Sequence, residues 1–334
     1  MPRKRVTKTL RQLLGESAKA TGASDVSITG VAYRSNDVSE GDVFFCIPGF
    51  AHDGHDFAPD AEKRGAAAIV VDRPLSVGVA QFVVEDTRKA LASAAAAFYD
   101  EPSKAMDVVG ITGTNGKTTT TYLLDSILKV AGRTTGLVGT VETRIKDERL
   151  KSSRTTPESL DLQALLAQMH DEGVNAVTME VSSHAIDLHR VDSVRFAVAA
   201  FSNLTQDHLD YHHTLEEYFS VKKRLFSDFE VGKRVINIDD PYGETMAAEF
   251  DACITVSRER PDATVSSSNE ELGATGTVFE LVTPLGSAQV RLPLAGAYNV
   301  SNALLAAGCA LGLGLSLGEI VAGLERAPQV PGRL

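Results

Sequence analysis

A run of glycines, a lysine and hydroxyl side chains follows an apolar segment in the first half of the chain, reading GITGTNGKTTT over residues 110–120. Where a strand ends and a helix begins, unpaired backbone N–H groups and the helix dipole favour a phosphate group. Gly113 and Gly116 allow the backbone to approach a phosphate, Lys117 can reach β- and γ-phosphates, and the Thr118 hydroxyl suits magnesium. An isoleucine stands where the strict Walker pattern has its first glycine. The segment therefore predicts a nucleotide phosphate site in a shortened form.

Further ligands for magnesium are expected at the ends of later strands, on the same edge of a parallel sheet. The segment MEVSSHAIDLHR places Glu180 at the end of one strand, and FSNLTQDHLDYHH places His208 shortly after the next. Five of the eight histidines lie between residues 184 and 213, which predicts a functional cluster. Within it we expect His212 and His213, as neighbours on a helix or turn, to be solvated.

A lysine interrupts an apolar helical face in the segment YFSVKKRLF. Tyr218, Leu225 and Phe229 share that face, and Lys222 lies on it too. Taken by itself, a lysine at such a position is expected to extend its ammonium group to water.

The elements that must position these residues alternate between strand and helix. Residues 27–100 predict a small α/β domain ending in a helix over 87–99, with a boundary near 101–104. From about residue 104 onward, short apolar runs and helices predict a doubly wound, mostly parallel domain resembling P-loop ATPases. Within it, Thr156 is expected to cap a helix, and an antiparallel hairpin is expected to turn at Pro284-Leu-Gly286. Two final helices are expected over 299–312 and 316–326.

Composition excludes several classes of function. The 334 residues carry a net charge of −11, with a pI of about 5.2, so the chain has no large cationic surface for nucleic acid or for anionic lipid. The three cysteines are widely separated, which argues against a disulfide framework or a thiolate zinc site. No apolar run is long enough to cross a membrane. We therefore expect a cytoplasmic protein without membrane insertion, and the sequence carries no signal for an oligomeric state.

Taken together, these segments resemble the Mur ligases of peptidoglycan synthesis, and most closely the MurE type. The resemblance runs from about residue 27 to the last residue and also includes the Thr155-Thr156-Pro157 segment and GAYNVSNALLA. It implies an ATP- and Mg²⁺-dependent ligase that adds a diamino acid to UDP-N-acetylmuramoyl-L-Ala-D-Glu through an acyl phosphate. It also implies a UDP-substrate-binding domain over residues 1–103 and an ATP-binding domain over residues 104–334.

The resemblance further implies a role for each matching residue. The nucleotide-binding residues would be Gly113, Thr114, Asn115, Gly116, Lys117, Thr118, Thr119, Asn299 and Asn302. Magnesium would be held by Thr118, Glu180, His208 and Lys222, the lysine being carbamylated so that it becomes an anion. Lys117, Lys222 and His208 would be the catalytic residues. The muramoyl-dipeptide would be held by Ser35, His52, Thr155, Thr156, Ser182 and Arg190.

Two departures from the family pattern leave other functions open. Arg34-Ser35-Asn36 stands where relatives carry Asp-Ser-Arg, a segment that helps to bind the UDP end. The sequence ends at Leu334, where a relative would continue into a third α/β domain that closes over ATP and selects the amino acid. We therefore expect a chain that lacks that domain. The alternatives are a nucleotide- and substrate-binding module without ligase activity, and a phosphotransferase or NTPase acting on an unrelated acid.

Overall fold

The computed structural model describes residues 7–15, 19–21, 26–150, 154–206 and 209–332, and these form two compact units. The N-terminal unit comprises the described residues up to Pro102 together with Glu158–Gln168 and Leu188–Ser193. The central unit comprises Ser103–Pro157, Met169–Asp187 and the described residues from Val194 onward. Two short segments that follow the first hundred residues in sequence therefore belong to the N-terminal unit.

A mostly parallel sheet in the order β2-β7-β6-β5-β4 organises the N-terminal unit. Its elements are β1 (Lys8–Thr9), α1 (Leu10–Leu14), β2 (Lys19–Thr21), β3 (Ser27–Ile28), β4 (Gly30–Ala32), β5 (Asp42–Phe45), α2 (Ala58–Lys63), β6 (Ala68–Val71), β7 (Ala80–Val83) and α3 (Thr87–Phe98). Helix α3 begins where Asp86 accepts hydrogen bonds from the N–H groups of Arg88 and Lys89, and its alanines favour helix. Leu160, from a later segment, packs into the core beneath this sheet.

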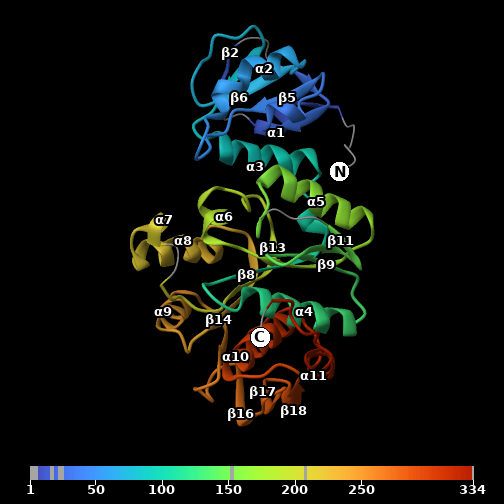
Figure 1. Ribbon diagram of the computed structural model, residues 1–334, viewed down its shortest axis with the longest axis vertical. Helices are drawn as coiled ribbons and strands as arrows, with labels where there is room; N and C mark the ends of the chain where they lie inside the picture. Colours follow the sequence, from blue (N-terminus) through green and yellow to red (C-terminus); the bar gives the residue numbers. More distant parts are fainter. Residues whose placement is uncertain (1–6, 16–18, 22–25, 151–153, 207–208, 333–334) are drawn as a thin grey trace. The chain divides into compact units, whose positions relative to one another are not determined.

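The central unit is built on one long mixed sheet, whose parallel strands run in the order β9-β12-β8-β13-β14-β15-β16 (Figure 1). The strands are β8 (Asp107–Thr112), β9 (Thr135–Val138), β10 (Thr143–Ile145), β11 (Glu148–Leu150), β12 (Ala176–Glu180), β13 (Phe196–Phe201), β14 (Val231–Asn237), β15 (Ile254–Ser257), β16 (Val265–Leu272), β17 (Thr277–Thr283) and β18 (Gly286–Leu292). Antiparallel strands extend the sheet at both ends. The doubly wound architecture predicted from the sequence is confirmed.

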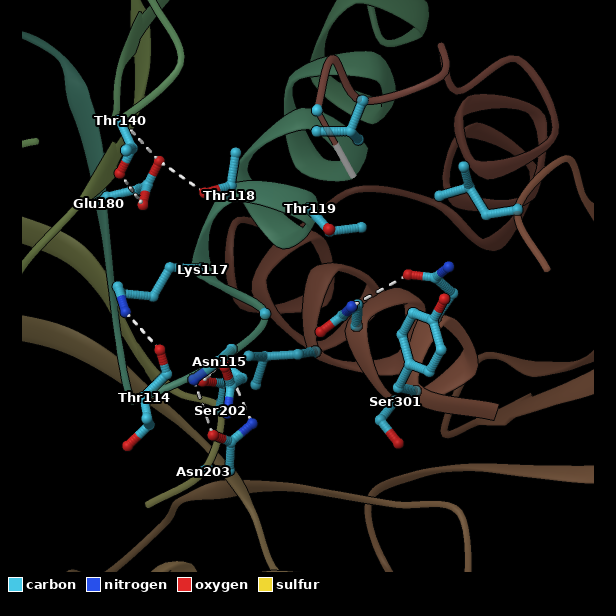
Figure 2. A pocket seen from close by; sticks show the side chains of 18 of the residues that line it. Thr114, Asn115, Lys117, Thr118, Thr119, Thr140, Glu180, Ser202, Asn203 and Ser301 are labelled. Atoms are coloured by element: carbon cyan, nitrogen blue, oxygen red, sulfur yellow. Dashed lines mark hydrogen bonds between the residues drawn. The ribbon is translucent and has the colours of Figure 1, made fainter. Parts of the chain in front are cut away.

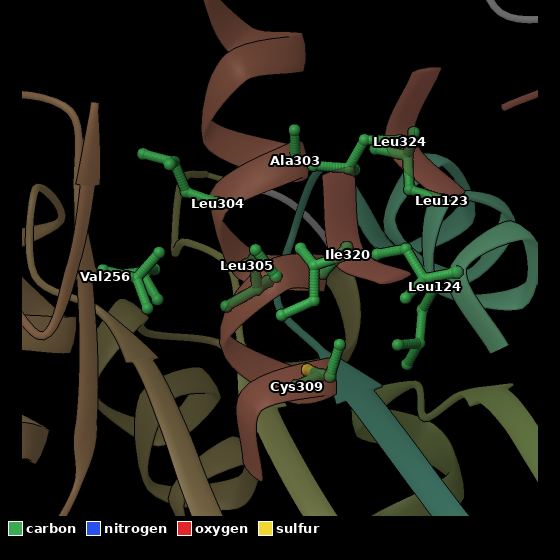
Figure 3. Packing of buried hydrophobic residues seen from close by; sticks show 14 of the residues in the cluster. Leu123, Leu124, Val256, Ala303, Leu304, Leu305, Cys309, Ile320 and Leu324 are labelled. Atoms are coloured by element: carbon green, nitrogen blue, oxygen red, sulfur yellow. The ribbon is translucent and has the colours of Figure 1, made fainter. Parts of the chain in front are cut away.

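The helices that follow α3 in the chain are α4 (Lys117–Val130), α5 (Ser159–Asp171), α6 (Ser183–Asp187), α7 (Leu209–His212), α8 (Leu215–Ser227), α9 (Pro241–Glu249), α10 (Ala297–Gly312) and α11 (Leu317–Glu325). Most of α5 belongs to the N-terminal unit. Helices α10 and α11 pack against α4 and, with the sheet, enclose the largest core (Figures 1 and 3). Leu124, Leu305 and Ile320 are among the side chains buried there. This packing fixes the start of α4, which follows directly after the glycine-rich segment.

Local predictions were confirmed in part. Thr283 pairs with Gly286, so the hairpin of β17 and β18 turns at the predicted position. Two predictions are wrong. Thr156 does not cap α5, because the helix begins at Ser159 and the Thr156 hydroxyl donates instead to the backbone carbonyl of Glu180 at 2.9 Å. Phe229 is not on the buried face of α8, because that helix ends at Ser227 and Phe226 occupies the position.

Among the helices of the described residues, none is both long enough and apolar enough to cross a membrane.

Candidate nucleotide site

The glycine-rich segment forms a tight loop between β8 and α4. Gly116 has φ of 86° and Gly113 has φ of 140°, conformations that side chains rarely adopt. Both glycines also lie against neighbours: a Cβ on Gly113 would stand 2.0 Å from Ser202 Oγ, and one on Gly116 would stand 2.3 Å from Asn302 Oδ1. The loop therefore requires glycine at both positions and presents backbone N–H groups at the start of α4.

The segment after β13 holds this loop in place. Thr114 N donates to Asn203 O at 2.8 Å, and Asn115 N donates to Asn203 Oδ1 at 2.9 Å. Ser202 Oγ donates to Asn115 O at 2.6 Å. Figure 2 shows Asn115, Ser202 and Asn203 gathered on one side of the loop. The ends of β8 and β13, neighbours in the sheet, thus fix the loop in one conformation.

Lys117, the first residue of α4, folds back over the loop. Its ammonium group donates to Gly113 O and to Thr114 O, both at 2.8 Å (Figure 2). A cation is thereby held beside the backbone N–H groups of the helix start. Both features attract an anion, and together they suit the terminal phosphates of a nucleotide.

Glu180 ends β12 beside the loop, and its side chain is only 1% exposed. Thr118 Oγ1 donates to Glu180 Oε1 at 3.1 Å, and Thr140 donates to the same carboxylate through its backbone N at 2.8 Å and its hydroxyl at 3.0 Å (Figure 2). Gly139 leaves space for it, since a Cβ there would stand 2.6 Å from Glu180 Oε1. A buried carboxylate beside a hydroxyl, at the carboxyl ends of adjacent parallel strands, is an oxygen set that fits Mg²⁺.

Three hydroxyl residues predicted to bind substrate lie close to Glu180 and its neighbour Thr140. Thr155 Oγ1 lies 3.0 Å from Thr140 Oγ1. Thr156 Oγ1 lies 3.4 Å from the backbone N of Ser182, in addition to its bond to Glu180 O. The structure therefore brings Thr155, Thr156 and Ser182 together at the end of β12.

A cavity of about 1250 Å³ opens beside the loop, within the central unit. The loop, Glu180, Thr155 and Ser182 line one part of it, and the start of α10 lines another. There Asn302 Nδ2 donates to Asn299 Oδ1 at 3.2 Å, and Asn299 Nδ2 donates to Ala295 O at 2.8 Å. Asn299 and Asn302, predicted to approach the nucleotide, thus face the same cavity as Lys117.

Lys222 is buried, with 1% of its side chain exposed, so the expectation that it reaches water is wrong. Its ammonium group donates to Gly113 O at 2.9 Å and lies 4.4 Å from the centre of the Tyr218 ring. The expectation of solvation is also wrong for His212. Its ring is buried, lies 5.0 Å from that of Tyr218, and brings Nε2 within 2.8 Å of Ser183 Oγ. His213 is exposed, as expected.

His208 lies outside the described residues, so its predicted place in the metal site is not described. Within the part of the chain that the structure covers, no three His, Cys, Asp or Glu side chains are grouped so that they could hold a metal ion.

The other predicted substrate residues belong to the N-terminal unit. Arg190 Nε lies 3.0 Å from Glu158 Oε1, within a largely buried ion pair. Ser35 donates a hydrogen bond to the Asp60 carboxylate, which together with Arg64 lowers the pKa of that carboxyl group. His52 packs edge-on against the ring of Phe57. The predicted substrate residues are therefore divided between the two units.

Sequence reasoning missed several residues of the site. Thr140 and Gly139 follow β9, the neighbour of β12, so the rule that strand ends converge at one sheet edge could have found them. Ser202 and Asn203 follow β13, the neighbour of β8, and could have been found by the same rule. Tyr298 lines the cavity although its side chain is mostly exposed, and only its position beside Asn299 indicated a role.

Comparisons with known proteins show the family of the chain. Residues 111–310 match the Mur ligase middle domain, and residues 27–99 match the Mur ligase family, catalytic domain. The UDP-N-acetylmuramoyl-L-alanyl-D-glutamate--2,6-diaminopimelate ligase of Bacillus licheniformis is 43% identical over 98% of this chain and 69% of its own. A solved structure of a ligase with that name has a TM-score of 0.87 at 27% identity, covering 98% of this chain and 68% of the other.

The MurF ligase of Thermotoga maritima, solved in complex with ADP, shares the fold with a TM-score of 0.65 at 22% identity, covering 91% of this chain and 67% of its own. The chain spans about two thirds of the length of the curated relatives it matches. The middle-domain match covers residues 111–310, and the relative from Bacillus licheniformis is similar along nearly the whole chain. The chain belongs to the Mur ligase family.

Proposed function

We propose that this chain supplies the ATP-binding and substrate-binding parts of a MurE-type ligase, which adds a diamino acid to UDP-N-acetylmuramoyl-L-Ala-D-Glu. The observation that carries the proposal is the hydrogen bond of 3.1 Å between Thr118 of the phosphate loop and the buried carboxylate of Glu180. It joins the two oxygen ligands expected for the magnesium of a bound nucleotide. The names of the relatives support the choice of substrate, and the chain spans about two thirds of their length.

ATP would bind in the cavity of the central unit. Its terminal phosphates would lie against Gly113–Thr119, where Lys117 supplies a positive charge, and the nucleoside would extend toward Asn299 and Asn302. Thr118 and Glu180 would hold one Mg²⁺, and His208 with carbamylated Lys222 would hold a second. Magnesium would neutralise the charge that develops on the transferred phosphoryl group.

Burial of Lys222 supports its proposed modification. Carbamylation joins the lysine nitrogen to carbon dioxide. Starting from the ammonium cation, the reaction releases two protons and leaves a carbamate anion. A buried side chain already aimed at the carbonyl of Gly113 would then carry its new carboxylate beside the phosphate loop. Tyr218, which contacts this side chain, would limit its movement.

The substrate would be held by Thr155, Thr156 and Ser182 of the central unit and by Ser35, His52 and Arg190 of the N-terminal unit. A γ-carboxylate oxygen of D-glutamate would attack the γ-phosphorus of ATP, and ADP would leave. The amine of the diamino acid would then attack the acyl carbon, phosphate would leave, and the amine would lose a proton. Such a reaction depends on positioning and charge neutralisation, which fits a site of hydroxyls, cations and backbone N–H groups.

Calorimetry tests the proposal directly. UDP-N-acetylmuramoyl-L-Ala-D-Glu is titrated into the chain, with UDP and UDP-N-acetylglucosamine as comparison ligands. We expect saturable binding of the muramoyl-dipeptide that Arg190→Ala weakens by roughly tenfold or more, because a charged hydrogen-bonding partner of the substrate carboxylate is lost. Arg195→Ala is the matched control, since Arg195 pairs with the exposed Glu230 of the central unit.

Two results would count against the proposal. If the unmodified chain does not bind the muramoyl-dipeptide, the substrate assignment fails, and only nucleotide binding is left to be tested. If Arg190→Ala and Arg195→Ala weaken binding equally, Arg190 has no specific role. Release of ADP that depends on the muramoyl-dipeptide would further separate a ligase from a binding module without activity.

A further inference from the structure

One carboxylate in the N-terminal unit lies between two guanidinium groups. Glu158, which immediately precedes α5, is only 5% exposed; its Oε2 lies 3.1 Å from Arg88 Nη1, and its Oε1 lies 3.0 Å from Arg190 Nε. Both arginine side chains are largely buried as well. Arg88 Nη1 donates a hydrogen bond to Glu158, whereas Arg190 forms an ion pair with it through close approach. A buried carboxylate between two cations restrains both of them, because moving either one leaves a buried charge less well paired.

Arg88 also binds a hairpin-shaped loop formed by residues 47–54, so Glu158 can act on this loop through Arg88. Its Nε and Nη2 donate to the carbonyl of Pro48, at 3.1 and 2.7 Å. Arg88 is also fixed at its backbone, since its N–H donates to Asp86 at the start of α3. The Arg88 guanidinium group therefore connects the start of α3, the Glu158 carboxylate and Pro48 of the hairpin.

The hairpin itself is closed by backbone hydrogen bonds. Gly49 N donates to His52 O at 3.0 Å, and Gly54 N donates to Ile47 O at 3.1 Å. At its tip Phe50 is 77% exposed, which is unusual for a phenylalanine in a loop with a fixed backbone. The tip of the hairpin is therefore exposed to solvent, while backbone hydrogen bonds hold the residues on either side of it.

Contacts of Asp53 hold the opposite side of the hairpin. Asp53 Oδ1 lies 2.6 Å from Nδ1 of the buried His55, and Asp53 Oδ2 lies 2.5 Å from Nη2 of Arg73. These contacts of Asp53 do not involve Glu158. The Pro48 side of the hairpin consequently depends on Arg88, while the Asp53 side has its own support.

We propose that Glu158 is a positioning residue that sets the 47–54 hairpin and Arg190 in one fixed arrangement for the two ends of the substrate. The inference rests on the proposed function, in which His52 of the hairpin and Arg190 both hold the substrate. It adds that the hairpin serves the UDP end, while Arg190 binds a carboxylate of the dipeptide. Glu158 is not among the residues proposed to hold the substrate. It acts through Arg88 on the hairpin and directly on the side chain of Arg190.

The chemistry of the carboxylate makes this role specific to glutamate. Glutamine has the same shape, but its amide nitrogen is a donor and would face one of the two guanidinium groups, which are also donors. In Glu158→Gln, one of the two arginine contacts is therefore lost, or both are weakened. The substitution leaves no cavity.

The test compares affinities for UDP alone, for the muramoyl-dipeptide and for Mg·ATP by calorimetry. We expect Arg88→Met to weaken UDP and the muramoyl-dipeptide by about tenfold, and Arg190→Met to weaken only the muramoyl-dipeptide. Glu158→Gln should weaken both UDP and the muramoyl-dipeptide. None of the three should change the affinity for Mg·ATP, which binds in the central unit.

Glu270→Gln is the matched control. Glu270 makes a half-buried pair with Arg258 in the central unit, at 2.7 Å, so the same substitution breaks a similar pair outside the N-terminal unit. It should change none of the three affinities. If Glu158→Gln behaves like this control while the unmodified chain binds the muramoyl-dipeptide, the inference is wrong and the proposed function stands. If Glu158→Gln also lowers the affinity for Mg·ATP, its role is general stability and the inference is equally overturned.

A second measurement needs no ligand, and so separates the inference from the proposed function. Hydrogen exchange of the Gly49 and Gly54 amides reports closure of the hairpin. Both amides should exchange faster in Glu158→Gln and in Arg88→Met than in the unmodified chain, and should be unchanged in Glu270→Gln. Unchanged exchange in Glu158→Gln would show that the carboxylate does not position the hairpin. Failure of the unmodified chain to bind the muramoyl-dipeptide would instead remove the proposed function.

Discussion

At the scale of single residues, Lys117 is the charge on which the nucleotide site depends. Its ammonium group is held beside the loop by two carbonyl groups and is placed to meet the terminal phosphates. We expect Lys117→Ala to reduce the affinity for Mg·ATP by roughly a hundredfold, because charged hydrogen bonds to phosphate are lost. Calorimetry measures the effect, and UDP binding should be unchanged.

Lys129→Ala is the control for this prediction. Lys129 lies near the end of the same helix, where it pairs with Asp125. Binding of Mg·ATP by Lys117→Ala with the affinity of the unmodified chain would show that the glycine-rich loop is not the phosphate site.

A second residue-scale prediction concerns Asp53 at the base of the hairpin. Partial burial acts to raise its pKa, but hydrogen bonds from the His55 backbone, from Arg73 and from the His55 side chain outweigh burial and lower it. The carboxylate therefore contributes stability above the usual aspartate pKa of about 3.9, and this contribution is lost as the pH falls below that value. We expect the free energy of unfolding to decline more steeply from pH 5 to pH 2 in the unmodified chain than in Asp53→Asn.

Chemical denaturation at several pH values measures this slope. Asp251→Asn, which removes an exposed carboxylate from the central unit, should leave the slope close to that of the unmodified chain. Parallel curves for the unmodified chain and Asp53→Asn would mean that the hydrogen bonds to Asp53 contribute nothing to acid sensitivity.

At the scale of elements, the contact of α11 with α4 supports the start of the phosphate-binding helix. A Cβ at Gly323 of α11 would stand 2.3 Å from the Cα of Ile127 in α4, so these helices approach through glycine. We expect Gly323→Ala to reduce the free energy of unfolding by about 1–3 kcal/mol, because the helices must separate. Gly318→Ala, in the same helix with no atom within 4 Å, should instead stabilise by about 0.5–1 kcal/mol. Equal effects of the two substitutions in thermal unfolding would contradict this account.

The same elements show what could be predicted from sequence. Strand β8, the glycine loop and α4 were predictable because their signals are local: an apolar run, glycines at fixed spacing and a periodic apolar face. The cap of α5 was not, because Thr156 is taken up by the Glu180 carbonyl, a partner 24 positions away. The burial of Lys222 and His212 depends in the same way on Gly113 and Ser183, which only the tertiary fold brings near.

At the scale of the whole molecule, the two units have separate cores although the chain passes between them repeatedly. Leu160 belongs to the core of the N-terminal unit despite following the phosphate-binding helix in sequence, whereas Leu124 belongs to the core of the central unit. Leu160→Ala should cost about 2–5 kcal/mol, since a buried leucine is removed from a packed core. The loss should appear as faster hydrogen exchange in β5 and β6, with β8 and β13 unchanged.

Leu124→Ala provides the converse case, because it removes a comparable side chain from the other core. It should speed exchange in β8 and β13 and leave β5 and β6 protected. It should also weaken Mg·ATP binding, since α4 begins at the phosphate loop, whereas Leu160→Ala should not. If either substitution instead speeds exchange equally in all four strands, the chain unfolds as one cooperative body. Nucleotide binding would then stabilise the N-terminal unit as much as the central one.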